Sequence, residues 1–280
     1  ELPFAGAGGS PVVTGFSAQH EALCDYLKHI TGQEAVMLFN SGFAANHAIC
    51  QTLFSEKKDL TQKNSLILAD KLSHASIIDG ALSSNAQFKR FAHNDVQHLS
   101  RILKINESDE PQDVLVISEG VFSMDGDKAP SVDLLKHCRE NNAWLMLDNA
   151  HAIGCEPASE LFKFQLAGEC VKPQIVMATF GKAIGTGGAF VAASKKVISY
   201  LQNFARHYVY STAFSPAHAL ATLTSLHIVE QELWRREKLN DNIRYFKKCC
   251  AELDISLMNS DSAIQPVLIG DPHIALMISA

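Results

Sequence analysis

The chain has 280 residues, of which 47% are hydrophobic, and a formal net charge of -6. This length and composition are sufficient to bury a substantial core. The acidic balance, without a clustered basic stripe, argues against a nucleic-acid-binding protein. No apolar run reaches the ~18 residues that a membrane span needs, so we expect none.

Short apolar runs alternate with amphipathic stretches along most of the chain. We predict strands over six of the runs, at Val36–Phe39, Leu66–Ala69, Val114–Ser118, Ala143–Leu147, Ile175–Ala178 and Ala189–Ala193. Helices are predicted between several of them, over Phe43–Leu53, Ala75–Leu82, His98–Leu103 and Ser131–Asn141. This alternation is typical of an α/β protein with a mostly parallel central sheet flanked by helices on both faces. Ligands of such sheets bind at the carboxyl ends of the strands.

The pattern changes in the last third of the chain. Helical periodicity begins at Pro216 and continues through Trp234 to about Leu253, and a strand-like run follows at Ile264–Ile269. The chain then stops as another helix begins. We expect a large domain over residues 1–225 and the start of a small C-terminal α+β domain over residues 226–280. The chain would then be a fragment that lacks flanking parts.

The cysteines favour an ordinary cytoplasmic protein. There are seven, an odd number, and no pair has the C-x-x-C spacing of many zinc and redox sites. Adjacent residues such as Cys249 and Cys250 have poor geometry for chelation. We therefore expect reduced thiols, a cytoplasmic location and no metal site.

The most informative residue is a lysine in a glycine-rich loop. Lys182 lies between Gly181 and Gly185, directly after the predicted strand Ile175–Ala178. Asp148 directly follows a second predicted strand, Ala143–Leu147, and His151 lies three residues later. Pyridoxal phosphate (PLP) requires a lysine that forms a Schiff base and an acid that keeps the pyridine nitrogen protonated. The pattern therefore predicts a PLP site, in which His151 holds the phenolic oxygen. A surface lysine, a helix cap and a buried histidine are the alternative interpretations.

Two further segments fit the same cofactor. Ser41–Asn46 follows the first predicted strand and opens a helix, whose free N–H groups bind phosphate, and Gly42 permits close approach. The hydroxyl of Thr179 can reach the same phosphate. An ordinary helix cap is the alternative for the Ser41–Asn46 segment.

Two more polar side chains follow predicted strands. His74 lies in the segment Leu72–Ser76, where an imidazole can stack on the cofactor and handle substrate protons. Ser123, in Glu119–Asp127, is a further hydroxyl at a strand end. The chain has no Gly-x-Ser-x-Gly motif nearby, so a serine hydrolase is disfavoured.

Together these segments resemble the α-oxoamine synthases, a family of fold-type I PLP-dependent transferases. The resemblance spans nearly the whole chain and is carried by Gly6–Ser10 with Thr14 and Gly15, Ser41–Asn46, Leu72–Ser76, His93–Asp95 with Glu119–Asp127, Asp148–His151, Thr179–Gly185 and Phe204–Thr212. One departure is Asn149, because the family usually has Asp-Asp-Ala-His here.

The resemblance implies roles around the cofactor ring. Lys182 carries PLP as an imine, Asp148 pairs with the pyridine nitrogen, and His151 pairs with the phenolic oxygen. His74 stacks on the ring, and Ser123 lies near its phenolic side. Lys182, His74, Asp148 and His151 are therefore the expected catalytic residues.

The resemblance also implies how the phosphate is held. The amides of Gly42 and Phe43 and the hydroxyl of Thr179 bind it within one subunit. Thr212 reaches the phosphate of the neighbouring subunit, so a homodimer with shared active sites is expected.

The implied reaction is the decarboxylative condensation of an amino acid with an acyl thioester. The Phe204–Thr212 segment favours L-alanine with a pimeloyl thioester, carried by CoA or by an acyl carrier protein. Within the family, relatives of glycine C-acetyltransferase, 5-aminolevulinate synthase and serine palmitoyltransferase stay open. A non-catalytic scaffold subunit is another alternative, but it would be expected to lack Lys182. A general PLP aminotransferase would differ by releasing no CO2.

Overall fold

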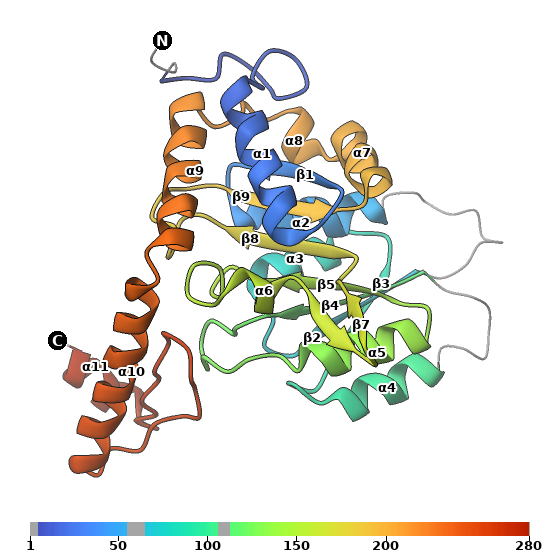
Figure 1. The fold of residues 1–280 in the computed structure, drawn as a ribbon. Coiled ribbons are helices and arrows are strands. Elements are labelled where there is room, and N and C mark those ends of the chain that lie inside the picture. Colours follow the sequence, from blue (N-terminus) through green and yellow to red (C-terminus); the bar gives the residue numbers. More distant parts are fainter. Residues whose placement is uncertain (1–4, 55–64, 106–112, 280) are drawn as a thin grey trace.

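A seven-stranded sheet forms the centre of the molecule (Figure 1). The structure is a computed structural model and describes residues 5–54, 65–105 and 113–279. The strand order is β1-β9-β8-β5-β4-β2-β3. The strands are β1 (Ala35–Phe39), β2 (Leu66–Asp70), β3 (Gln87–Phe91), β4 (Val114–Glu119), β5 (Trp144–Asp148), β8 (Ile175–Thr179) and β9 (Ala189–Ala193). Only β9 runs antiparallel to its neighbours, so the predicted mostly parallel sheet is confirmed.

Helices cover both faces of the sheet (Figure 1). The helices in the described ranges are α1 (Ala18–Thr31), α2 (Gly42–Leu53), α3 (Ala75–Leu82), α4 (Val96–Ile105), α5 (Ser131–Glu140), α6 (Ala158–Leu161), α7 (Lys195–Phe204), α8 (Arg206–Val209), α9 (Pro216–Gln231), α10 (Trp234–Glu252) and α11 (Pro272–Ser279). Of these, α10 and α11 extend away from the sheet (Figure 1). A separate two-stranded sheet joins β6 (Phe164–Leu166) and β7 (Glu169–Val171). No helix in the described ranges is long and apolar enough to span a bilayer.

Alternation along the strands divides the buried side chains between two faces. In β1, Met37 packs in a core with residues of α2, α3 and α7, whereas the next residue, Leu38, packs in a core with residues of α1 and α9. Successive side chains of a strand point to opposite faces, so an apolar run such as β1 fills both cores. The burial on both faces fixes the strand ends in space.

The parallel arrangement gathers the strand ends that carry polar residues. Strand β9 is antiparallel to both β1 and β8, so β1 and β8 point the same way as the remaining strands. Glu119 and Asp148 are the last residues of the neighbouring strands β4 and β5 and lie opposite each other in register. Five segments that follow carboxyl ends of strands therefore meet at one edge of the sheet.

The strand predicted at Ile264–Ile269 is wrong. In the structure this run makes only an isolated bridge, between Val267 and Leu257. An apolar run becomes a strand only where a neighbouring strand pairs with it, and the described residues offer no such ladder here. The domain division at residue 225 stays a prediction, and α9 crosses that position as one continuous helix.

Candidate active site

A cavity of about 150 Å³ lies at the carboxyl edge of the sheet. Its lining includes most of the site residues that the sequence predicts, namely Gly42, Phe43, His74, Asp148, His151, Thr179 and Lys182. The remaining lining residues are Asn46, Ser76, Glu119, Ala150 and Met177. Strands β1, β2, β4, β5 and β8 all lead into this cavity, as expected for a ligand site in a parallel sheet.

Lys182 is presented by a loop with a fixed backbone. After β8, the Phe180 N–H donates to the carbonyl of Gly188 (2.9 Å), and the Thr186 N–H donates back to the carbonyl of Phe180 (2.9 Å). The Phe180 side chain is fully buried, which anchors the loop, whereas Lys182 is exposed and lines the cavity. The amine is therefore accessible on a rigid support.

Asp148 is a buried carboxylate held by two donors. Its side chain accepts hydrogen bonds from Asn46 Nδ2 (2.8 Å) and from the backbone N–H of Ala150 (2.9 Å). Burial raises the pKa of Asp148, while the two hydrogen bonds and the charge of Lys182 oppose that rise. A cationic ring nitrogen beside this carboxylate would compensate for the lost hydration and favour the ionised form.

Burial shifts two other titratable groups of the cavity toward their neutral forms. Burial, together with the neighbouring charge of Asp148, raises the pKa of Glu119 to about 8. Burial, reinforced by the positive charges of Lys182 and His74, lowers the pKa of His151 to about 4. Glu119 is then a neutral acid and His151 a neutral imidazole, both able to make directional hydrogen bonds.

The phosphate end of PLP fits the start of α2. The Thr179 hydroxyl oxygen is buried and has no hydrogen-bond partner among the described residues. A Cβ atom at Gly42 would lie only 2.5 Å from the Cγ2 of Thr179, so a larger residue would close this space. The first N–H groups of a helix have no partner within it, which leaves those of Gly42 and Phe43 free for an anion. The residues present fit a phosphate.

Two predicted site residues do not line the cavity. Ser123 is half-buried in a turn. The turn is closed by a hydrogen bond from the Phe122 N–H to the carbonyl of Asp127 (3.0 Å). Thr212 is exposed beside a separate small cavity, and its carbonyl accepts a hydrogen bond from Asn40 (2.8 Å). Their roles stay predictions, as do those of the residues around the cavity.

Three polar residues of the cavity lining were not predicted from the sequence: Asn46, Ser76 and Glu119. All three are buried, at 1%, 1% and 3% exposure respectively. Each belongs to a segment that carries the family resemblance, and this is the signal that could have identified them. Residue type alone could not, since Asn, Ser and Glu are common at helix starts and strand ends.

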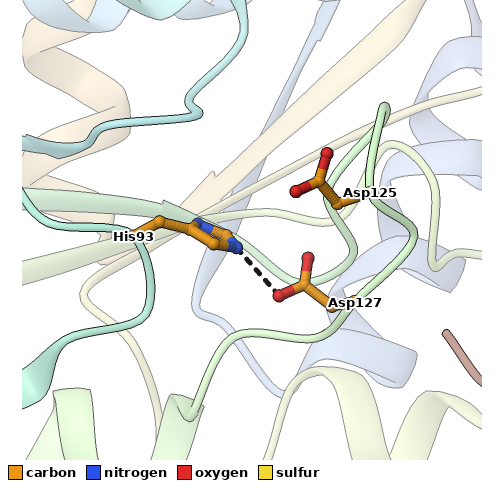
Figure 2. A group of neighbouring side chains, drawn as sticks. All are labelled: His93, Asp125 and Asp127. Atoms are coloured by element: carbon orange, nitrogen blue, oxygen red, sulfur yellow. Dashed lines mark hydrogen bonds and ion pairs between the residues drawn. The ribbon is translucent and has the colours of Figure 1, made fainter. Parts of the chain in front are cut away.

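A second polar group, here called the His93 ion-pair group, consists of His93, Asp70, Asp125 and Asp127. Figure 2 shows three of these side chains converging, with the imidazole of His93 joined to Asp127. His93 Nε2 lies 2.8 Å from Asp127, and Nδ1 lies 2.8 Å from the fully buried Asp70. Burial lowers the pKa of His93, but the two carboxylates outweigh it and the pKa is raised. Both ring nitrogens are therefore occupied in an ion-pair network.

Comparison with known proteins gives a consistent family. The sequence matches the family described as aminotransferase class I and II over residues 7–279. It is 41% identical over 276 residues to the 8-amino-7-oxononanoate synthase of Photobacterium profundum, covering 98% of this chain and 68% of the relative.

Solved structures agree with this match. A serine palmitoyltransferase from S. paucimobilis, solved with a bound PLP–myriocin aldimine, superposes with a TM-score of 0.85 at 27% identity and covers 98% of this chain and 69% of that one. An 8-amino-7-oxononanoate synthase from Francisella tularensis has a TM-score of 0.77 at 29% identity and covers 94% of this chain and 75% of that one.

Proposed function

The chain belongs to the aminotransferase class I and II family and, within it, to the α-oxoamine synthases; we propose that it condenses L-alanine with a pimeloyl thioester. The products would be 8-amino-7-oxononanoate, CO2 and a free thiol, a step of biotin synthesis. The enzyme is a PLP-dependent acyltransferase. We propose a cytoplasmic location.

The observation that carries the proposal is the cavity itself. It is lined by an accessible Lys182, a buried Asp148 and the hydroxyl of Thr179, which has no partner among the described residues. These three groups have the chemistry needed for the aldehyde, the ring nitrogen and the phosphate of PLP, which supports the proposal. A non-catalytic scaffold subunit would be expected to lack the lysine. The identity of 41% to a named synthase over nearly the whole chain supports the particular reaction.

Four side chains act in the proposed mechanism. When bound, PLP supplies an electron sink for charge that develops at Cα of the amino acid. Lys182 Nζ would hold the cofactor and, once the amino group of alanine has displaced it, the free amine would accept the Cα proton of alanine. The Asp148 carboxylate holds the proton on the pyridine nitrogen, and His151 donates a hydrogen bond to the phenolic oxygen. His74 delivers a proton to the product carbon after CO2 leaves.

Two observations bear on the choice of substrate. The serine palmitoyltransferase structure superposes with the higher TM-score, 0.85 against 0.77, so an enzyme of that kind is the second candidate. Sequence identity favours the first candidate, at 41% against 27%. Backbone similarity reports the shared family fold, whereas side chains select the substrate, so we give the sequence more weight.

We also propose that the enzyme is a homodimer whose sites are shared. Thr212 is exposed and lies outside the cavity of its own subunit, so its hydroxyl is available to a partner. Phe43 at the cavity and Tyr210 near Thr212 are 47% and 73% exposed, as expected for side chains covered in an assembly. In a mixed dimer of Thr212→Val and Lys182→Ala subunits, one site would carry both defects and the other neither. About half the activity should then return relative to the wild-type dimer.

Product analysis tests the reaction. The protein with PLP should convert L-alanine and pimeloyl-CoA, or the pimeloyl thioester of an acyl carrier protein, into 8-amino-7-oxononanoate with equal amounts of CO2 and thiol. Glycine with acetyl-CoA, glycine with succinyl-CoA, and L-serine with palmitoyl-CoA test the related enzymes. Faster turnover of any of these pairs would replace the proposed substrates, and product without CO2 would indicate an aminotransferase.

A further inference from the structure

A continuous chain of hydrogen bonds joins Asp148 to His74 through two residues with no assigned role. Asn46 Nδ2 donates to Asp148 Oδ2 (2.8 Å) and to Ser76 Oγ (3.0 Å). Ser76 Oγ in turn lies 2.7 Å from His74 Nδ1. The two connecting side chains are each 1% exposed, so water does not compete for these bonds.

The backbone decides which nitrogen of the neutral His74 ring carries the proton. His74 is the N-cap of α3, and its Nδ1 accepts a hydrogen bond from the backbone N–H of Ser76 (3.2 Å). A backbone N–H can only donate, so Nδ1 must present its lone pair. The hydroxyl of Ser76 donates to the same nitrogen. The neutral ring therefore carries its hydrogen on Nε2, which is the nitrogen left for the cavity.

The orientation of Asn46 is fixed by the same logic. Its NH2 group faces the Asp148 carboxylate and the Ser76 oxygen, which accepts because its own hydrogen goes to His74. Rotating the amide by half a turn would place Asn46 Oδ1 against the carboxylate. The fold tolerates a buried Oδ1 with no partner in the described residues in order to keep both donors aligned.

A glycine sets the distance between the two helices that carry this chain. Asn46 is on α2 and Ser76 is on α3. A Cβ atom at Gly80 would lie 2.9 Å from the Cα of His47 and 3.1 Å from the carbonyl oxygen of Asn46. Only glycine allows so close an approach of the helices.

From these contacts we infer that Asn46 and Ser76 are positioning residues, which orient the Asp148 carboxylate toward the cofactor and fix His74 as a donor through Nε2. The inference deepens the proposed function and rests on it for the roles of Asp148 and His74. The hydrogen-bonded arrangement itself is a property of the protein alone and can be tested without turnover.

Nitrogen NMR of histidine-labelled protein without cofactor provides the first test. The His74 signals, identified by their loss in His74→Phe, should show the neutral ring protonated at Nε2. A neutral ring protonated at Nδ1 would overturn the inference. Because this measurement needs no substrate, its outcome is separate from that of the proposed function.

A double-mutant cycle provides the second test. Asn46→Leu removes a hydrogen bond to a charged group and should lower kcat about tenfold to a hundredfold. Ser76→Ala removes hydrogen bonds between neutral groups and should lower kcat about twofold to tenfold. KM for alanine should change by less than about threefold. Because Asn46 and Ser76 belong to one chain of hydrogen bonds, removing both should lower kcat hardly more than the more damaging of the two single substitutions.

A matched control separates positioning from packing. Ser118 is also a fully buried serine, on β4, but it does not line the cavity. Ser118→Ala should keep kcat, while Ser76→Ala should not, at equal folded fraction by circular dichroism. Equal kcat in the two variants, or additive effects of Asn46→Leu and Ser76→Ala, would overturn the inference.

Discussion

Two polar groups lie near one edge of the same sheet, and they differ in how far their members satisfy one another. In the His93 ion-pair group, the imidazole is matched on both nitrogens by carboxylates, and the neighbouring Asn94 adds a further bond to Asp127 (2.7 Å). In the cavity, the Thr179 hydroxyl has no partner among the described residues, and Lys182 is exposed. The cavity therefore leaves a hydroxyl and an amine open to a ligand. In the ion-pair group the central imidazole is paired on both nitrogens, and the open positions are the oxygens Asp127 Oδ1 and Asn94 Oδ1, which have no partner among the described residues.

The two groups contain the same residue types, but we expect the ion-pair group to stabilise the fold and the cavity group to act in catalysis. Both groups contain histidine and aspartate within segments that carry the family resemblance. A carboxylate such as Asp70, fully buried and paired with His93, connects the end of β2 to the loop before α4. Loss of such a pair should affect stability first, and loss of a cavity residue should affect turnover first.

The largest effect is expected from Lys182→Ala. Without the amine there is neither a covalent attachment for PLP nor a base for the Cα proton, so turnover should be abolished. The exposed side chain contributes little packing, so the melting temperature should stay within a few degrees of wild type. Borohydride reduction and peptide mapping of the wild type check the attachment site, and pyridoxyl label on another lysine would contradict the assignment.

Asp148→Asn should come next, with a loss of several orders of magnitude in Cα deprotonation. A neutral amide cannot hold the proton on the pyridine nitrogen, so the electron sink weakens, although the cofactor should remain bound. The measurement is exchange of the alanine Cα hydrogen into deuterated solvent. Exchange at a near-normal rate would show that Asp148 has another role.

His74→Phe should lower product formation by ~10²–10⁴-fold, the usual contribution of general acid–base catalysis. The aromatic ring is kept for stacking, so alanine should still change the absorbance of the bound cofactor. Titration of that absorbance with alanine, beside the rate of product formation, separates the two steps. A variant that forms product at the full rate would make His74 a packing residue.

His93→Gln tests the other group and should cost ~1.5–3 kcal/mol of folding free energy, the usual worth of hydrogen bonds to charged groups. The pKa of His93 is raised in the folded state, so its contribution is complete below the ordinary value of 6.5 and is lost as pH rises through the higher folded value. Denaturant unfolding over a pH series measures this. Turnover per folded molecule should fall far less than in Asp148→Asn. A larger fall in turnover than in Asp148→Asn would mean that His93 also acts in catalysis.

The smallest effect is expected from Glu119→Gln. The pKa of Glu119 is raised from 4.5 to about 8, so the folded protein keeps a proton that the unfolded chain releases, and stability falls across this pH range. The glutamine variant lacks this dependence and should gain about 1.4 kcal/mol relative to wild type between roughly pH 6 and pH 7. Unfolding curves at the two pH values check it, and a difference that does not change with pH would mean that Glu119 is ionised throughout.

Much of the fold could be predicted from the sequence, because strands buried on both faces consist of continuous apolar residues and are therefore visible as apolar runs. The six predicted strands appear with ends shifted by a residue or less. Strand β3, Gln87–Phe91, was missed because only Phe91 of its five residues is buried, as befits an edge strand. The Ile264–Ile269 run has the composition of a strand, but among the described residues it makes only one isolated bridge.

The candidate site was predictable only in part. Lys182, Asp148 and Thr179 could be predicted to line the cavity because Asp148 and Thr179 end strands and Lys182 lies in the glycine-rich loop that follows β8. The link from Asn46 to Asp148 depends on which strands are neighbours, and the order β8-β5-β4-β2 does not follow the chain order. Sequence periodicity reports one element at a time and contains no information on that order.

The pairing of β1 with β9 determines when the site can come into existence. Val36 on β1 lies opposite Ala192 on β9, so the strand that precedes Gly42 finds its neighbour only after about 150 further residues have been made. During synthesis, the phosphate cradle would remain separated from Thr179 until β9 has left the ribosome. Contacts so distant in the chain form slowly. We therefore expect nascent chains that end before residue 189 to lack PLP affinity, however well their helices have formed.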